Sequence, residues 1–134
     1  MFFCASITLP DFPANGPSEI LNNWPFVKLA KETAEYIEKE KKLLRPYNLT
    51  APAPGKGFEI FNSKNNFKVG VLNLMGNVFM KKCDDVFIEI EKFLKIYNLR
   101  KNYDFLIIDV HGEITSEKMA IGHLFDGKAT LITG

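Results

Sequence analysis

From residue 67 onward, the chain alternates short apolar runs with segments of helical periodicity. The apolar runs cover residues 67–74, 105–110 and 129–133, and the periodic segments between them cover residues 85–97 and 115–124. Strands that are separated by helices pair in parallel through right-handed crossovers. This half of the chain therefore predicts an α/β fold whose elements follow the order β-α-β-α-β.

A fourth apolar run, at residues 58–61, lies just before this alternation and is joined to it by a short polar turn. Two strands so close in sequence predict an antiparallel hairpin. Asp84 or Asp85 can cap the first helix of the alternation, because a carboxylate accepts from the free backbone N–H groups there. Thr115 or Ser116 can cap the second helix in the same way. The sequence thus predicts a β-hairpin that continues into the β-α-β-α-β unit.

The first part of the chain has a different character. Residues 1–26 contain four prolines and are predicted to be irregular, because proline blocks helix continuation and central strand pairing. Apolar residues then recur at three- and four-residue steps, which predicts an amphipathic helix over residues 27–44, before Pro46. We therefore place the domain boundary at residue 27, with a single domain over residues 27–134.

Composition excludes several classes of protein. The chain has 134 residues with 17 basic and 16 acidic side chains, so its formal charge of +1 predicts no stable nucleic-acid binding and no attraction to anionic membranes. No apolar run approaches the roughly 20 residues that span a bilayer. Cys4 and Cys83 belong to no C-x-x-C pattern, which favours a reducing compartment over a disulfide scaffold. We expect a cytoplasmic protein.

The strand over residues 105–110 ends in polar residues that could carry chemistry. Asp109 and His111 are two residues apart, so their side chains point to the same side of the strand. Ligands of α/β sheets bind at the carboxyl ends of the strands, and an imidazole beside a carboxylate suits metal binding or acid–base catalysis. Alternatively, Asp109 accepts from local backbone groups and His111 is an ordinary strand-end histidine. Glu117 and His123 can be explained by the dipole of the helix that carries them.

Four stretches together resemble one protein family. The chain is similar to the YmdB-like branch of the bacterial calcineurin-like metallophosphoesterases over about residues 31–134. The stretches that carry this resemblance are LLRPYN at residues 43–48, PGKG at 54–57, VLNLMGNVFM at 71–80 with two aspartates soon after it, and IDVHGEITSEKMAIGHLFDGKATLITG at 108–134.

The resemblance implies a four-layer α/β/β/α sandwich with a centre of two divalent metal ions (iron, manganese or similar). It also implies phosphodiesterase activity on 2′,3′-cyclic nucleotides. His111 matches the metal-binding histidine of the family's D-x-H block, with Asp109 and Glu113 as supporting neighbours. The family's Gly-Asp, Gly-Glu-Asn, Gly-Asn-His and Thr-His-Thr-His motifs have no counterpart here. We therefore assign no catalytic residue and expect no tightly bound metal ion.

Three interpretations follow from this partial match. The first is a truncated and inactive phosphodiesterase fragment, possessing only part of the family's sandwich. The second is one piece of a split phosphodiesterase, completed by a second polypeptide that restores the metal centre. The third is a small α/β protein with a binding or scaffold role. An incomplete sandwich leaves open sheet edges and uncovered apolar faces, so we also expect self-association or a complementing fragment.

Overall fold

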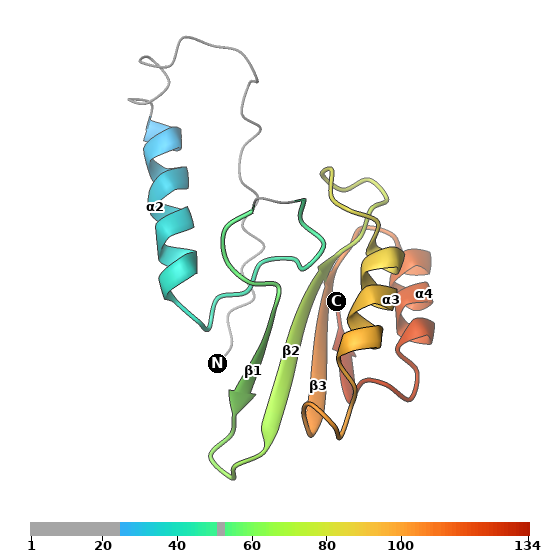
Figure 1. The fold of residues 1–134 in the computed structure, drawn as a ribbon. Coiled ribbons are helices and arrows are strands. Elements are labelled where there is room, and N and C mark those ends of the chain that lie inside the picture. Colours follow the sequence, from blue (N-terminus) through green and yellow to red (C-terminus); the bar gives the residue numbers. More distant parts are fainter. Residues whose placement is uncertain (1–24, 51–52) are drawn as a thin grey trace.

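The computed structural model describes residues 25–50 and 53–134 of the chain (Figure 1). Three helices and four strands form in these residues. No helix in this part of the chain is long and apolar enough to cross a membrane. In chain order the elements are α2 (Pro25–Lys39), β1 (Phe58–Asn62), β2 (Lys68–Met75), α3 (Val86–Ile96), β3 (Phe105–His111), α4 (Thr115–Leu124) and β4 (Leu131–Thr133).

The four strands form one sheet in the order β1-β2-β3-β4. β1 pairs with β2 in antiparallel orientation, whereas β2, β3 and β4 run parallel to one another. The predicted hairpin and the predicted β-α-β-α-β order are therefore both confirmed. The register places Met75 beside His111, and it places Asp109 between Asn73 and Thr133.

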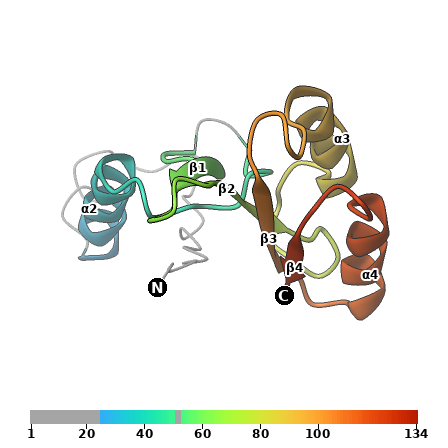
Figure 2. The ribbon, with the colours of Figure 1, turned by 90° about the horizontal axis from the view of Figure 1, so that it is seen from below.

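Helices α3 and α4 cover one face of the sheet (Figure 2). Alternate side chains of β2 and β3 point to this face, as the period of a strand requires, and they pack against the apolar stripes of the two helices. Phe93 lies at the centre of an aromatic group, with its ring centroid 4.9 Å from Phe58, 5.0 Å from Tyr97 and 5.8 Å from Tyr47. The buried core consists of Leu72, Leu74, Val86, Ile90, Phe93, Tyr103, Leu106, Ile108, Val110, Ile121 and Phe125.

The opposite face of the sheet is less well covered at β3 and β4. Phe105 is 40% exposed and packs against Phe67, with 5.5 Å between the ring centroids. Leu131 on β4 pairs with Ile107 of β3, points to the same face as Phe105 and is 51% exposed. Helix α2 lies beyond β1, on the side of the sheet away from β4 (Figure 2). Exposed apolar side chains thus remain on this face among the described residues.

The boundaries of two elements, α2 and β4, differ most from the prediction. Helix α2 begins at Pro25, two residues before the predicted start at residue 27. Proline suits the first helical turn, because a backbone N–H at that position would have no acceptor within the helix. The helix ends at Lys39 rather than at residue 44. Leu44 is only 4% exposed and bridges to Lys56, because the chain must leave the helix to bring this side chain into the interior. The last strand is also shorter than the predicted residues 129–133, because the N–H of Ala129 still donates to Phe125 in the preceding turn.

One of the two predicted helix caps is confirmed. The Asp85 side chain accepts from the N–H groups of Phe87 and Ile88 at the start of α3. The prediction for α4 is wrong, because its N-cap position is Ile114, which makes no side-chain cap. Thr115 already belongs to the first helical turn, so its hydroxyl cannot take the capping position.

The buried hydroxyl of Tyr103 is expected to make the stability of the fold depend on pH above about 10. Its side chain is 2% exposed, its hydroxyl has no hydrogen-bond partner among the described residues, and burial raises its pKa to about 12. We expect Tyr103→Phe to raise the free energy of unfolding by about 1 kcal/mol, because it removes a buried hydroxyl without a partner. Since the folded pKa exceeds the usual value of about 10, the wild-type chain loses stability as pH rises through 10 to 12.

Urea unfolding between neutral and alkaline pH measures both effects. The Tyr103→Phe variant is expected to show a flatter pH dependence above pH 10. Tyr36→Phe is the control, because Tyr36 is 58% exposed. A Tyr103→Phe variant that is less stable than the wild type would show that the hydroxyl has a partner.

Candidate functional site at the carboxyl ends of the parallel strands

Three polar side chains form a row across the sheet, one from each parallel strand. Asp109 of β3 lies between Asn73 of β2 and Thr133 of β4. Its Oδ1 accepts from the Thr133 hydroxyl at 3.1 Å, and its Oδ2 accepts a longer contact from Asn73 Nδ2 at 3.5 Å. Asp109 therefore interacts with side chains of neighbouring strands, and not with a local backbone turn.

His111 lies at the end of β3, on the same side as Asp109, and its side chain is exposed. The structure thus brings the two residues of the D-x-H pattern together at the carboxyl edge of the sheet, as the sequence predicts. The backbone carbonyl of His111 accepts from the N–H of Gly76 at 2.9 Å, which ties it to the end of β2. Glu113 lies exposed in the loop between β3 and α4.

The loop that follows β2 starts beside His111, and the Asn48 side chain is hydrogen-bonded to its backbone. Asn48 is 1% exposed. Its Oδ1 accepts from the N–H of Met75 at 3.0 Å, and its Nδ2 donates to the carbonyl oxygens of Met75 at 2.7 Å and Asp84 at 3.0 Å. One side chain therefore holds both ends of the loop over residues 76–84.

Asn77 and Glu117 make further hydrogen bonds that hold the same loop. Asn77 Oδ1 accepts from the N–H of Val86 at 2.8 Å, and its Nδ2 donates to the carbonyl of Asp84 at 3.1 Å. The N–H of Asn77 donates to Oε1 of Glu117 at 2.8 Å. Glu117 is 6% exposed and reaches this loop from the first turn of α4. We call these three residues, Asn48, Asn77 and Glu117, the loop clasp.

Cys83 lies inside the same loop and is not an activated nucleophile. Burial raises the pKa of its thiol, and the nearby carboxylates of Asp84 and Glu117 raise it further. A raised pKa lowers the thiolate fraction, which is the reactive form. Cys4 lies outside the described residues.

Sequence reasoning missed the loop clasp. It attributed Glu117 to the helix dipole, and it gave no role to Asn48 or Asn77. One polar signal was available, but it belongs to the row across the sheet: Asn73 interrupts the apolar run of β2 and donates to Asp109. A buried amide must be hydrogen-bonded, so it predicts polar partners nearby. The partners themselves come from distant segments and could not be identified by local pattern.

Glu117 gives a direct test of the loop clasp. We expect Glu117→Ala to lower the free energy of unfolding by about 2 kcal/mol, because it removes a charged acceptor and leaves the N–H of Asn77 without this partner. Chemical unfolding measures the loss. Glu113→Ala is the matched control, since Glu113 is exposed and is expected to have little effect. Equal stability of the two variants would contradict the role of Glu117.

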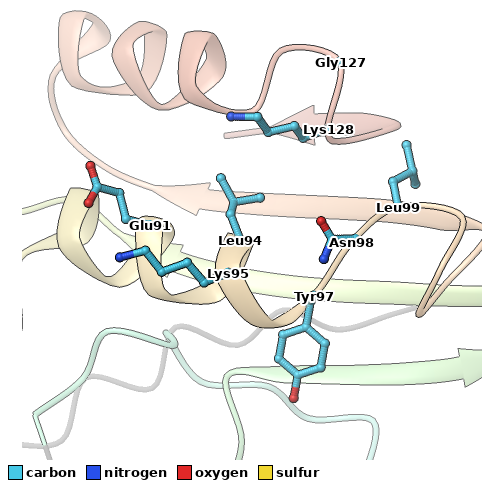
Figure 3. A pocket seen from close by; sticks show the side chains of 8 residues that line it. All are labelled: Glu91, Leu94, Lys95, Tyr97, Asn98, Leu99, Gly127 and Lys128. Atoms are coloured by element: carbon cyan, nitrogen blue, oxygen red, sulfur yellow. The ribbon is translucent and has the colours of Figure 1, made fainter.

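A separate hollow of about 480 Å³ lies near the amino ends of the parallel strands, between the end of α3 and the turn before β4 (Figure 3). Lys95 and Lys128 line it, and Lys128 Nζ donates to the carbonyl of Leu124 at 3.0 Å. The carboxyl-terminal ends of α3 and α4 lie here, and their partial negative charge favours lysines and disfavours anionic ligands. This hollow is therefore no candidate site for a phosphate ester, and it is distant from the D-x-H pattern along both β3 and β4.

The residues at the carboxyl edge do not by themselves fit a centre of two metal ions. Among residues 25–50 and 53–134, no group of three or more His, Cys, Asp or Glu side chains could hold a metal ion. Both oxygens of Asp109 already have side-chain neighbours, which leaves His111 as the exposed donor of the pair. Divalent ions that are bound tightly need several ligands in a fixed geometry.

The comparison with models of protein families shows to which family this chain belongs. The model of the YmdB-like protein family matches residues 25–134, which include all of the described strands and helices. The chain belongs to the YmdB-like family. The family resemblance predicted from the sequence is therefore confirmed.

Individual proteins that are similar to this chain match most of its length. A curated Bacillus subtilis relative, named 2′,3′-cyclic-nucleotide 2′-phosphodiesterase, is 35% identical over 104 residues, which are 78% of this chain and 38% of the relative. A hypothetical protein from Thermus thermophilus superposes with a TM-score of 0.67 at 29% identity, over 80% of this chain and 46% of that one. A phosphatase from Mycoplasma pneumoniae gives a TM-score of 0.62 at 28% identity, over 78% of this chain and 43% of that one.

These matches confirm the α/β fold and show its extent. The chain spans less than half the length of the curated relative and of both solved structures. The four strands and three helices described here therefore correspond to part of the YmdB-like fold. The metal-binding role of His111 stays a prediction, as do the supporting roles of Asp109 and Glu113.

Proposed function

We propose that this chain carries one part of a metal-dependent phosphodiesterase site and is inactive by itself. His111 is the metal ligand that it contributes, with Asp109 and Glu113 as supporting neighbours. The observation that carries the proposal is the exposed His111 at the carboxyl end of β3, within a segment that matches the YmdB-like family throughout. The name of the Bacillus subtilis relative suggests 2′,3′-cyclic nucleotides as substrates of the complete site.

The proposal of inactivity follows from the number of donors. A single imidazole holds a divalent ion weakly, because affinity increases with the number of ligands and with their preorganisation. The Asp109 carboxylate would have to give up its contacts with Thr133 and Asn73 before it could serve as a full ligand. A complete site therefore needs donors beyond the residues that the structure describes.

Calorimetric titration with Mn²⁺ and an assay with 2′,3′-cyclic AMP test the proposal together. We expect weak binding that His111→Ala abolishes, and no hydrolysis by the isolated chain. His123→Ala is the control, because His123 is the second histidine of the chain and is exposed in α4. Tight binding of two ions with turnover by the isolated chain would contradict inactivity. Unchanged Mn²⁺ binding in His111→Ala would remove His111 as the ligand.

A second candidate is one piece of a split phosphodiesterase. The exposed apolar side chains of Phe105 and Leu131 favour it, since a second polypeptide could cover this face of the sheet. Adding a polypeptide that carries the remaining YmdB-like motifs should then produce hydrolysis, and Phe105→Asp should prevent it. Sedimentation of the chain alone distinguishes self-association, which would cover the same face without hydrolysis.

A further inference from the structure

The loop between β2 and α3 presents an aromatic side chain to solvent. Phe79 is 86% exposed, the largest exposed fraction among the large apolar side chains of the described residues. Its neighbour Val78 is 40% exposed. Neither side chain belongs to the hydrophobic core, so the fold gains little from an aromatic residue at this position.

The backbone at Phe79 is strained. Its φ angle is +60°, in the left-handed region. This conformation costs about 1–2 kcal/mol for a residue with a Cβ atom, and it is uncommon for a bulky side chain. Strain of this kind persists only where the surroundings impose it. We attribute it here to the loop clasp, because Asn48, Asn77 and Glu117 hold the loop at both ends.

Phe79 lies at the same edge of the sheet as His111. The loop begins at Gly76, whose N–H donates to the carbonyl of His111 at 2.9 Å. Phe79 is three residues further along, so its Cα atom is within about 11 Å of that of Gly76. The loop that carries Phe79 therefore starts at the strand end that carries His111.

The charges around Phe79 indicate the chemistry of such a ligand. Lys81 and Lys82 follow it in the same loop and are exposed; of the two aspartates beyond them, Asp84 is also exposed and Asp85 is the cap of α3. An aromatic ring beside ammonium groups suits a ligand with a flat apolar part and a negative part. A nucleotide has both, since its base stacks on aromatic rings and its phosphate attracts lysine.

We propose that Phe79 is a base-stacking residue, held out by the loop clasp to bind the nucleobase of a nucleotide at the carboxyl edge of the sheet. This inference rests on the proposed function, because it names the ligand part that the same edge would recognise. The ribose phosphate would lie toward His111, and the base would lie on Phe79.

Binding to the whole chain is measured by chemical-shift titration with two probes. The probes are 2′,3′-cyclic AMP and ribose 5-phosphate, which lacks a base. Phe79→Ala is expected to weaken binding of the cyclic nucleotide by about 5- to 150-fold, from the 1–3 kcal/mol of one stacked base, and to leave ribose 5-phosphate binding unchanged. Phe79→Tyr should retain binding, because it keeps the ring. Phe105→Ala is the control for an exposed aromatic residue elsewhere.

Several results would overturn the stacking role. They are equal nucleotide binding by wild type and Phe79→Ala, an equal loss of both probes, and no binding of the nucleotide by the wild-type chain. Self-association that is lost in Phe79→Ala would identify a protein contact instead. Base-dependent binding without any effect of His111→Ala would support stacking while contradicting the proposed function. Nucleotide binding that is lost in His111→Ala but unchanged in Phe79→Ala would support the proposed function and contradict stacking.

The strain has its own test, independent of any ligand. Phe79→Gly and Phe79→Ala both remove the ring, but only glycine adopts a positive φ angle freely. Phe79→Gly is therefore expected to unfold at a higher temperature than Phe79→Ala. The reverse order would show that the loop clasp does not impose the left-handed backbone.

Discussion

Replacing Phe93 with alanine is expected to lower the free energy of unfolding by about 3–5 kcal/mol. The Phe93 side chain is fully buried between α3 and the sheet, and it contacts the rings of Tyr47, Phe58 and Tyr97. Truncation removes apolar contacts and leaves a cavity that rigid neighbours cannot fill. Because whole domains are stable by only about 5–15 kcal/mol, this single change is expected to remove a large share of the total stability.

Urea unfolding, followed by far-ultraviolet circular dichroism, measures this loss. Ile96→Ala is the matched control, because Ile96 ends the same helix and is 61% exposed. The control should change stability by less than about 0.5 kcal/mol. If Phe93→Ala were as stable as Ile96→Ala, the aromatic group would not be the centre of the core.

Replacing Gly57 with alanine is expected to destabilise the chain by about 3 kcal/mol, at the upper end of overpacking effects. A Cβ atom on Gly57 would lie 2.2 Å from Cα and 2.7 Å from the backbone nitrogen of Tyr47. These are backbone atoms, so no side-chain rotation relieves the contact. The N–H of Tyr47 donates to the carbonyl of Asn73, and the N–H of Asn73 donates to Gly57. The added methyl group would therefore push apart two hydrogen-bonded segments that hold β2.

Gly122 gives the opposite expectation and serves as the control. A Cβ atom there meets nothing within 4 Å, and the residue lies inside α4. Gly122→Ala is expected to raise the free energy of unfolding by up to about 1 kcal/mol, because alanine favours the helix. Thermal unfolding of both variants tests the pair. A Gly57→Ala variant with the stability of Gly122→Ala would mean that the segment around Tyr47 can move away freely.

The order of the elements along the chain and the parallel orientation of the last three strands could be predicted from the sequence, because both depend on local pattern. Apolar runs of strand length alternate with amphipathic segments, and this alternation restricts β2, β3 and β4 to parallel pairing. Boundaries were less accurate where tertiary contacts override the local pattern. The end of α2 at Lys39 is one example, since the periodicity continues to Leu44 but the core requires that side chain elsewhere.

The candidate site was predicted only in part, for a related reason. Asp109 and His111 are adjacent on one strand, so their shared side follows from the period of two. The loop clasp joins positions that are far apart in sequence, and nothing local to Asn48 or Asn77 shows that they meet. We attribute the left-handed backbone of Phe79 to the same distant contacts, and nothing in the local sequence indicates it.

The bond between Asn77 and Glu117 has a consequence for the order of folding. It joins positions that are 40 residues apart, and it can form only after β3 and α4 have docked. Closing so long a connection is slow compared with forming a helix turn or a hairpin. The loop over residues 76–84 is therefore expected to acquire its shape among the last events of folding. By the same reasoning, its amides are expected to be among the first to exchange with solvent when the native chain opens locally.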